Sequence, residues 1–405
     1  MDTVKKTYLA IAFLLVLILL TGACVPQNNL APTQSPEPTQ SPVPTQLNTP
    51  ISEPPMEEAA QPFPVGWEVE LVVEDLDIPW SVVFPQENRI LITERTGRIR
   101  EVVDGVLNPS AVFSFDEVME VGEAGLMGMA LHPDYAQNKS VYVCYATSVG
   151  GSMIDRVVRL IDTGNMRLDT IILDNIPAAR FHAGCRLKFG PDEKLYISTG
   201  DALSPQLAQD IDSLAGKILR VNDDGSIPGD NPFADSPVFS TGHRNPQGIS
   251  WDSEKGILYA SEHGPSGFDG PGGGDEINVI IPGGNYGWPL VSHEEVLEGT
   301  IKPMIQFTPA EAPGSMLFYN RDELPFFKGN LFFGALRGEG VMRLIVSEDG
   351  KTIQRVEKIV NNVGRVREVT AGPDGSIYFT TSNRDGRADP REGDDRLFRI
   401  IPVFE

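Results

Sequence analysis

Histidine, arginine and asparagine side chains that could bind and deprotonate a ligand occur in five short strings, far apart in the chain. The net charge of the chain is −23, so arginines kept inside glycine-bounded, apolar strings indicate a specific anionic ligand rather than a solvated basic surface. A fold that brings the strings together would make one anion-binding pocket that also holds a base. The strings span residues 182–186, 242–248, 262–265, 336–338 and 365–367.

Two of these strings carry groups suited to proton transfer and hydrogen bonding. His182 precedes two small residues, and imidazole is the side chain whose ordinary pKa best suits proton abstraction near neutral pH. Taken alone, however, this histidine is better explained as a hydrogen-bonded structural residue. Arg244 and Asn245 supply a planar donor fork and an amide within a glycine-bounded loop. A network that only stabilises the loop explains this second pair equally well.

Two further strings could hold an anion and a cation. Arg365 and Arg367 are two apart in a strand-like segment, so both side chains should point to the same face. Guanidinium groups side by side repel each other, and a facing polyanion removes that penalty. The alternative is a pair of surface arginines matched by carboxylates. Arg337 ends another strand-like string, and the Gly264-Pro265 turn could present backbone carbonyls to Ca²⁺, although such turns are common.

Short strands separated by turns recur along the chain and must position these strings. The chain contains 40 Gly and 33 Pro, so turns are abundant and long helices are not expected. A strand, a turn and a second strand recur in about six units, spaced roughly 40 to 60 residues apart, which is typical of a β-propeller. We therefore predict an all-β fold, a six-bladed β-propeller of four-stranded antiparallel blades, with a pair of β-sandwiches as the alternative. The units cover residues 80–92, 128–145, 187–198, 249–261, 330–345 and 369–381.

The N-terminus is expected to direct export. Two lysines precede an apolar run that is shorter than the roughly 20 residues of a membrane-spanning helix, and small residues lead up to Cys24. Residues 1–23 therefore predict a signal peptide, and the pattern resembles a bacterial lipobox with lipidation of Cys24. An ordinary secretory signal is the alternative. Residues 24–62, rich in Pro, Thr, Gln and Ser, predict a disordered tether, and residues 63–405 the propeller domain.

Composition restricts the partners of the protein. An acidic chain lacks the clustered lysine and arginine that nucleic acid requires, and it is not attracted by charge to anionic membranes. The expected location is the extracytoplasmic face of a bacterial membrane, with the lipid as the sole attachment. Cys144 and Cys185 are too few to form a disulfide scaffold, and whether they pair is open.

Several strings occur together in the order found in one known family. They span residues 79–80, 93–95, 123–126, 132–134, 242–248 and 285–289. Over about residues 64–405 the chain resembles the glucose/sorbosone dehydrogenase family, sugar dehydrogenases that use pyrroloquinoline quinone (PQQ) with Ca²⁺. The resemblance implies oxidation of the anomeric C–OH of an aldose to the lactone by hydride transfer to PQQ. Electrons would then pass to a respiratory or soluble acceptor.

The resemblance also implies roles for individual residues. His182 matches the general base, and Arg244 with Asn245 matches residues over the quinone carbonyls and the sugar, where Arg244 stabilises developing charge. Gly264 and Pro265 match the backbone ligands of the Ca²⁺ that holds and polarises the cofactor. The remaining matches are Arg337, Arg365 and Arg367 for the cofactor carboxylates, and Glu276 and Tyr286 for part of a second, structural Ca²⁺ site.

The chain departs from the glucose-oxidising members of that family at the sugar. Phe181 stands where those members have a carboxylate, and Glu123 where they have glutamine, so glucose specificity is not implied. Arg337 stands in place of a lysine, which keeps the charge but changes the geometry. Two rival functions are a Ca²⁺-dependent lactone hydrolase on a propeller and a non-catalytic binding propeller. Arg365 and Arg367 count against the lactone hydrolase. The presence of His182 together with these arginines counts against the non-catalytic propeller.

Overall fold

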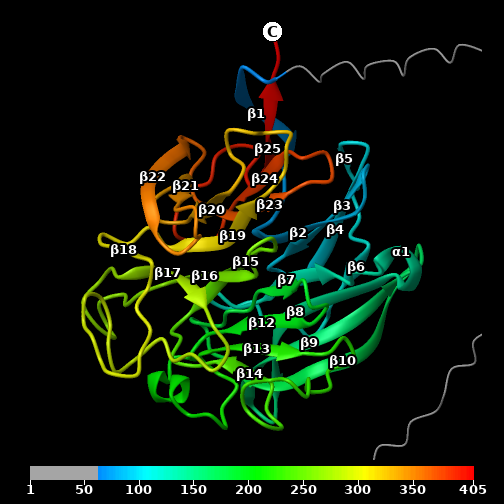
Figure 1. The fold of residues 1–405 in the computed structure, drawn as a ribbon. Coiled ribbons are helices and arrows are strands. Elements are labelled where there is room, and N and C mark those ends of the chain that lie inside the picture. Colours follow the sequence, from blue (N-terminus) through cyan, green and yellow to red (C-terminus); the bar gives the residue numbers. More distant parts are fainter. Residues whose placement is uncertain (1–62) are drawn as a thin grey trace, which may run out of the picture. The chain divides into compact units, whose positions relative to one another are not determined.

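Six antiparallel β-sheets form a ring in the computed structural model, which describes residues 63–405 (Figure 1). The predicted signal peptide, Cys24 and the tether lie outside the described residues. The first strands of neighbouring sheets contact one another around a closed circuit and line a central channel. The prediction of a six-bladed propeller is therefore confirmed, and the sandwich alternative is wrong.

Each blade is one sheet, and the strands below run from the channel outward. The first blade comprises β2 (Pro79–Gln86), β3 (Arg89–Glu94), β4 (Arg98–Val103) and β5 (Val106–Leu107), with the short β6 (Phe113–Ser114) also on β4. The second comprises β7 (Leu126–Leu131), β8 (Ser140–Val149), β9 (Ser152–Asp162) and β10 (Met166–Pro177). The third comprises β11 (Leu187–Phe189), β12 (Leu195–Thr199), β13 (Lys217–Val221) and β14 (Val238–Ser240).

The other three blades follow the same plan. The fourth comprises β15 (Pro246–Asp252), β16 (Ile257–Glu262), β17 (Asp275–Ile280) and β18 (Ile305–Phe307). The fifth comprises β19 (Pro313–Tyr319), β20 (Asn330–Ala335), β21 (Gly340–Val346) and β22 (Ile353–Val360). The sixth comprises β23 (Val366–Ala371), β24 (Ile377–Thr381), β25 (Leu397–Val403) and β1 (Gly66–Val73). The described helices are short, α1 (Tyr135–Asn138) and a 3₁₀ turn (Pro205–Ala208), and none is long and apolar enough to cross a membrane.

The predicted repeat units coincide with the inner hairpins of five blades. The fifth blade is the exception, because the unit at 330–345 covers β20 and β21, the second and third strands. Its innermost strand is β19, whose seven residues are all buried. A fully buried strand carries no alternation of apolar and polar residues, so β19 gave no periodic signal.

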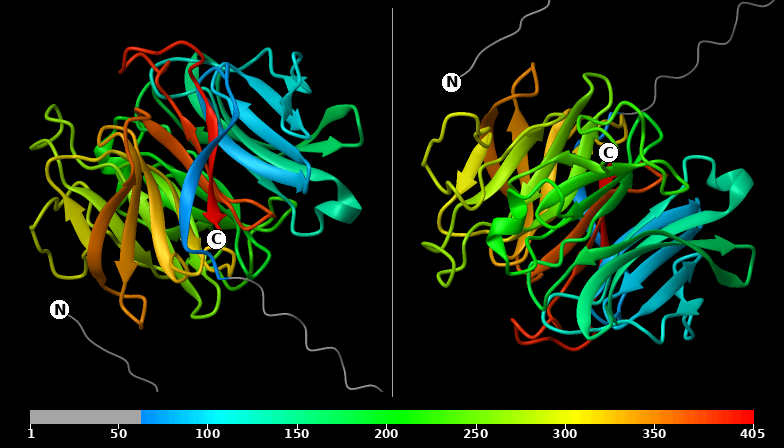
Figure 2. Two further views of the ribbon diagram at one scale, coloured as in Figure 1. Left: turned by 90° about the horizontal axis from the view of Figure 1, so that it is seen from above. Right: turned by 90° about the horizontal axis from the view of Figure 1, so that it is seen from below.

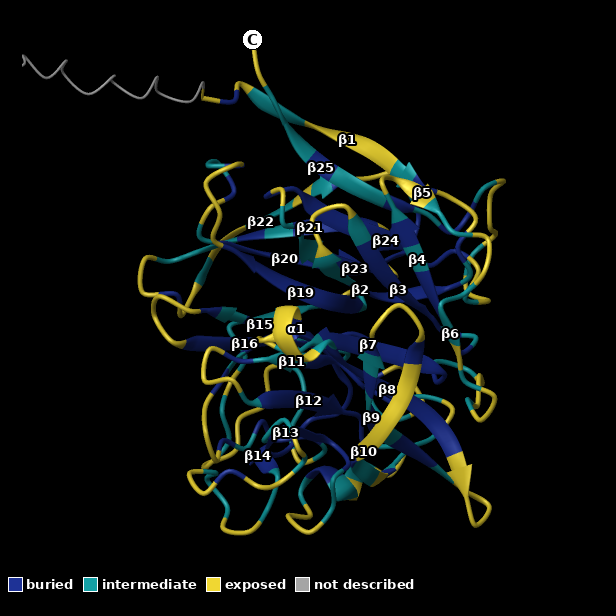
Figure 3. Cartoon of the chain, turned by 90° about the vertical axis from the view of Figure 1, so that its right-hand side faces the viewer, coloured by how far each residue is buried: buried dark blue, intermediate teal, exposed yellow. Residues whose placement is uncertain are grey.

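The two ends of the described chain close the ring. β1 is the outer strand of the sixth blade and pairs with β25 in antiparallel register from Gly66 opposite Val403 to Val73 opposite Leu397. Figure 2 shows this first strand (blue) beside the last (red). Apolar and charged residues alternate from residue 67 onward, a pattern that predicts a strand over residues 67–73, and β1 confirms this strand. Several β1 side chains face solvent, as expected for an outer strand (Figure 3).

A disulfide joins the second and third blades. Cys144 in β8 is bonded to Cys185, with their Cα atoms 6.3 Å apart, and both residues are fully buried. Cys185 lies three residues after His182, so the bond fixes the loop that carries the candidate base. Cys144 and Cys185 are therefore paired, a point that the sequence left open.

Replacing Cys144 and Cys185 together with alanine is expected to lower the free energy of unfolding by about 2 to 4 kcal/mol. The bond closes a 41-residue separation and so restricts the unfolded chain. Chemical unfolding of the double variant and of the wild type, with and without reductant, measures the difference. Equal unfolding free energies in the oxidised and reduced wild type would show that the bond does not stabilise the ring.

Candidate functional site

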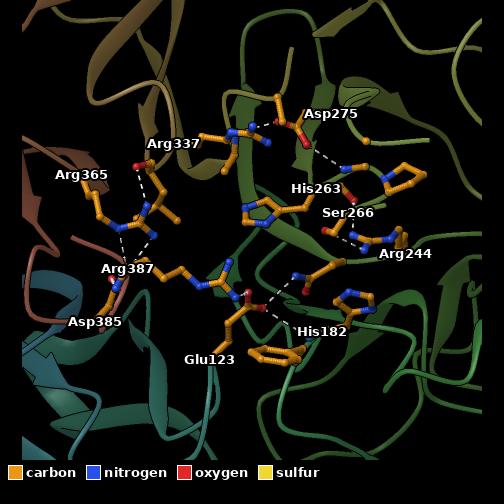
Figure 4. Close-up of a pocket in the computed structure, with 18 of the residues that line it drawn as sticks. Glu123, His182, Arg244, His263, Ser266, Asp275, Arg337, Arg365, Asp385 and Arg387 are labelled. Atoms are coloured by element: carbon orange, nitrogen blue, oxygen red, sulfur yellow. Dashed lines mark hydrogen bonds and ion pairs between the residues drawn. The ribbon is translucent and has the colours of Figure 1, made fainter. Parts of the chain in front are cut away.

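A cavity of about 320 Å³ opens where the innermost strands of the blades begin (Figure 4). Its walls are loops that precede β7, β11, β15, β19 and β23, together with loops that follow β3, β16, β20 and β24. The five strings singled out from the sequence therefore do meet at one mouth of the channel. The predicted residues that line it are Glu123, Phe181, His182, Arg244, Asn245, Gly264, Pro265, Arg337, Arg365 and Arg367.

His182 is held by a buried carboxylate. Its Nδ1 lies 2.7 Å from Oδ1 of Asp201, whose Oδ2 accepts a hydrogen bond of 2.8 Å from the indole of Trp288. Because an ionised carboxylate only accepts, the hydrogen-bond geometry assigns the imidazole proton to Nδ1. Nε2 is left as the acceptor, which is the state a general base requires. Asp201 is fully buried and was not among the residues found from the sequence.

Arg244 and Asn245 are fixed by neighbours on the same rim. Arg244 donates through Nε to Asp269 at 2.7 Å and through Nη1 to the carbonyl of His263 at 3.1 Å. Burial raises the pKa of the Asp269 carboxyl, but the hydrogen bond and charge of Arg244 outweigh it and hold that pKa below its ordinary value. Asn245 Oδ1 accepts a hydrogen bond of 3.2 Å from the backbone of Gly184. The loop network considered from the sequence is thus present, and both side chains still border the cavity.

Arg365 and Arg367 are both buried, so the interpretation of them as surface residues is wrong. Arg365 donates to Asp385 through Nε at 2.9 Å and Nη2 at 2.7 Å. Arg367 donates through Nη1 to Oε1 of Gln247 at 2.7 Å, while its Nε has no hydrogen-bond partner among residues 63–405. Burial lowers the pKa of Arg367 to about 10 against the opposing charge of Asp385. An incompletely paired, desolvated guanidinium is the group that an anionic ligand would stabilise.

Glu123 and Phe181 form another wall together with Arg387. Glu123 Oε1 accepts a hydrogen bond of 3.0 Å from Arg387 Nη2, and that guanidinium lies 5.5 Å from the centre of the Phe181 ring. Burial raises the pKa of Glu123, but the positive charge around it, from His263 and His182 when they are protonated and from Arg387 and Arg367, outweighs burial and lowers that pKa below its ordinary value. The carboxylate is therefore an ionised acceptor close to the imidazole.

Phe268 completes the rim beside the base. It belongs to a glycine-rich loop, is 67% exposed, and its ring lies nearly parallel to His182 at 6.0 Å between centroids. The sequence reasoning did not single it out, because the conformation of such a loop is not determined by local pattern.

The Gly264-Pro265 turn has a shape that requires glycine. A Cβ on Gly264 would lie 2.3 Å from the carbonyl oxygen of Gly273. Asp275 fixes the turn by accepting hydrogen bonds from the backbones of Gly264 at 2.8 Å and Ala312 at 2.6 Å. Within the described chain the Gly264 carbonyl accepts no backbone hydrogen bond, whereas the Pro265 carbonyl accepts one of 3.1 Å from Gly273. Uncommitted carbonyl oxygen is the ligand that Ca²⁺ prefers.

Glu276 and Tyr286 line a separate, smaller cavity of about 20 Å³ on the same turn. The Tyr286 hydroxyl donates to the Val279 carbonyl at 2.6 Å and accepts from Ile281 at 3.0 Å, so the phenol is already occupied. Burial and the neighbouring Glu262 charge raise the pKa of Glu276 to about 7. In the region from residue 63 onward, no three His, Cys, Asp or Glu side chains form a metal-binding group. The second Ca²⁺ site stays a prediction.

The mouth of this propeller holds a histidine positioned as a base and more arginines than carboxylates. It is therefore a site of the class that binds an anion and can deprotonate a bound group. A family model described as glucose/sorbosone dehydrogenase matches residues 76–390. The chain therefore belongs to the glucose/sorbosone dehydrogenase family, and the resemblance seen in the sequence is confirmed.

Solved and curated relatives agree with this assignment. A putative oxidoreductase (glucose dehydrogenase) of Thermus thermophilus is 43% identical with a TM-score of 0.77, covering 83% of this chain and 100% of its own. The PQQ-bound aldose sugar dehydrogenase of Streptomyces coelicolor is 32% identical with a TM-score of 0.74, covering 84% and 99%. The aldose sugar dehydrogenase YliI of Escherichia coli is 32% identical over 355 residues, which cover 80% of this chain and 92% of the relative.

Proposed function

We propose that the protein is a PQQ- and Ca²⁺-dependent dehydrogenase that oxidises the anomeric C–OH of an aldose to the lactone. One observation carries the proposal: a single cavity contains His182, held by Asp201, together with Arg365 and Arg367. The relatives from Streptomyces coelicolor and Escherichia coli, both described as aldose sugar dehydrogenases and the first bound to PQQ, support it.

The charge of the cavity fits the cofactor. Six arginines and three carboxylates line it, and two of the arginines, Arg95 and Arg244, are paired with Glu120 and Asp269 just outside the lining. Positive charge still exceeds negative charge around the cavity, which suits PQQ, a tricarboxylate. The unpartnered Nε of Arg367 is an orphaned buried donor that a carboxylate would satisfy. Arg337 is exposed and makes no ion pair within residues 63–405, which leaves it available to a ligand carboxylate. The cofactor would therefore be held by Arg337, Arg365 and Arg367.

In this reaction the side chains of the protein itself have to remove the proton of the anomeric hydroxyl. When bound, PQQ supplies the acceptor for the hydride that leaves the anomeric carbon, and Ca²⁺ polarises that acceptor. His182 Nε2 takes the hydroxyl proton, while Asp201 stabilises the imidazolium that forms. Arg244 and Asn245 point donors into the same cavity and stabilise negative charge that develops there. The Gly264 carbonyl would face the Ca²⁺, and the Pro265 carbonyl would do so while it also accepts the hydrogen bond from Gly273.

The sugar is expected to lie between His182 and the wall made by Glu123, Phe181 and Arg387. Glu123 offers an ionised acceptor to sugar hydroxyls, and Phe181 offers an apolar face to ring C–H groups. The substrate class proposed is the aldoses, without assignment to glucose. The excess of guanidinium groups opposes the rival lactone hydrolase, because that reaction needs several carboxylates around one cation.

We also propose that the protein acts outside the cytoplasm, as a lipoprotein acylated at Cys24. The sequence of residues 1–24 supports this location, and the electron acceptor would then be a respiratory or soluble carrier.

Addition of PQQ and Ca²⁺ to the purified apoprotein tests the function. We expect stoichiometric quinone binding, and dye reduction that depends on an added aldose across a panel of hexoses, pentoses and disaccharides. Quinone binding without dye reduction on any aldose would disprove the substrate class. Absence of both would disprove the enzyme.

A further inference from the structure

A second cavity, of about 380 Å³, lies toward the opposite end of the channel from the candidate active site. Its lining comes from further along the same innermost strands, and every blade contributes. Its size falls in the range of about 300 to 1,000 Å³ that is usual for small-molecule sites. Residues from the six blades include Val82, Met129, Lys188, Ile249, Met316 and Thr370.

A buried layer separates the two cavities. The ring of Trp80 is 1% exposed and has the Arg367 guanidinium at 5.6 Å and the Arg186 guanidinium at 4.1 Å from its centre. Gln247 accepts a hydrogen bond from each arginine, through Oε1 for Arg367 at 2.7 Å and through its backbone carbonyl for Arg186 at 3.0 Å. A ligand in the second cavity would therefore not occupy the place proposed for PQQ.

The second cavity carries unbalanced positive charge. Its charged lining residues are Arg186, Lys188, Arg321 and Glu368. Arg186 and Glu368 form an ion pair at 2.5 Å and neutralise each other. Within residues 63–405, neither Lys188 nor Arg321 makes a side-chain hydrogen bond or an ion pair. Two cations without partners thus remain in a protein whose net charge is −23.

Lys188 lies where an unpaired cation is unfavourable. It points from β11 into the interior of the ring, and burial lowers the pKa of its ammonium group to about 8, against the opposing charge of Glu368. Its side chain is nevertheless only half-buried, because the cavity opens beside it. An anion bound there would offset the desolvation of the ammonium group.

Most of the remaining lining is apolar. Phe84, Leu131, Phe189 and Met316 are among the side chains that border the cavity. A pocket with apolar walls and a few convergent charged groups is typical of a site for an amphiphilic small molecule. An inorganic ion would leave these walls unused.

We propose that this second cavity binds an organic monoanion, with its carboxylate or sulfonate at Lys188 and its apolar body against the side chains of the channel. Arg321 adds attraction for the same charge. This site is distinct from the proposed cofactor site, and its existence does not depend on the proposed dehydrogenase activity.

Titration of the purified protein with 8-anilinonaphthalene-1-sulfonate, a fluorescent aromatic sulfonate, tests the site without cofactor or sugar. We expect saturable binding that octanoate displaces and that octanol and inorganic phosphate do not. Lys188→Met, which keeps the length of the side chain and removes its charge, is expected to raise the Kd of the probe about tenfold. Lys188→Arg is expected to retain binding.

Two matched variants locate the probe. Lys351→Met removes an equal charge from an exposed turn, and Arg365→Ala alters the first cavity; both are expected to bind the probe like the wild type. Equal Kd values for Lys188→Met and Lys351→Met would overturn the proposal, as would displacement by phosphate or octanol. Weaker binding by Arg365→Ala would place the probe in the first cavity and overturn it too.

The wild type supplies a readout that needs no variant. Because the ammonium group is charged below its pKa of about 8, probe affinity is expected to fall as the pH rises through 8. A sulfonate keeps its charge over that range, and the two other charged groups beside Lys188, Arg186 and Glu368, are held together as an ion pair at 2.5 Å. An affinity that does not change between pH 6.5 and 9.5 would contradict the role of Lys188.

Discussion

Replacement of His182 by alanine is expected to lower kcat about 10²- to 10⁴-fold and to leave PQQ binding unchanged. The imidazole would accept the anomeric proton through Nε2, because Asp201 holds Nδ1 at 2.7 Å. No arginine that would grip the cofactor carboxylates is bonded to His182, so the cofactor should still bind. Steady-state dye reduction and quinone titration measure the two effects separately.

Asp201→Asn and His132→Ala are the matched variants for that experiment. An asparagine side chain in place of Asp201 would no longer fix the imidazole proton on Nδ1, so kcat should fall without loss of the quinone. His132 lies outside the cavity, beside Asn138 and the backbone of Asp134, and its removal should leave kcat unchanged. A His182→Ala protein with the kcat of the wild type would exclude this histidine as the base.

Replacement of Arg367 by methionine is expected to weaken PQQ binding about 10- to 100-fold. Its guanidinium has an unpartnered Nε and a pKa that burial lowers to about 10, and both features would be relieved by a cofactor carboxylate. The same replacement should not destabilise the apoprotein, because it removes an incompletely paired buried cation. Quinone titration and chemical unfolding of the apoprotein give the two values.

Arg343→Met provides the comparison for Arg367→Met. Arg343 lies in β21 and is paired with Glu357 and Asn330, away from the cavity. Its loss should leave quinone affinity unchanged and reduce stability. If Arg367→Met instead lowers the free energy of unfolding and keeps the affinity for PQQ, then Arg367 has a structural role only.

Asp201 shows how a residue missed in the sequence could have been found. β11 and β12 pair in antiparallel register with Leu187 opposite Ile197, and extending that register places His182 beside residues 201 and 202. A hairpin therefore brings the base and its carboxylate together across 19 residues. In the sixth blade Val366 lies opposite Thr381, so the same register places Arg365 beside Ser382. Asp385, three residues further on, meets Arg365 from the turn that follows β24.

Other parts of the site could not be derived in this way. Phe268 reaches His182 from the loop between β16 and β17, which no strand pairing constrains, and the glycines of that loop permit many backbone paths. The alternation in residues 67–73 predicted a strand but not its partner, because β25 is separated from it by almost the whole domain. The local sequence pattern was enough to predict individual strands. Which side chains meet depends on how strands far apart in the chain pair with one another.

The pairing of β1 with β25 has a consequence for biosynthesis. β1 is synthesised long before its neighbour in the sheet, β25, which spans Leu397–Val403, so it stays unpaired until that segment has been made. A nascent or prematurely terminated chain consequently leaves the edges of β1 and β24 uncovered, where they are open to proteolysis and to pairing with other chains. Only a polypeptide that extends through β25 can close the ring.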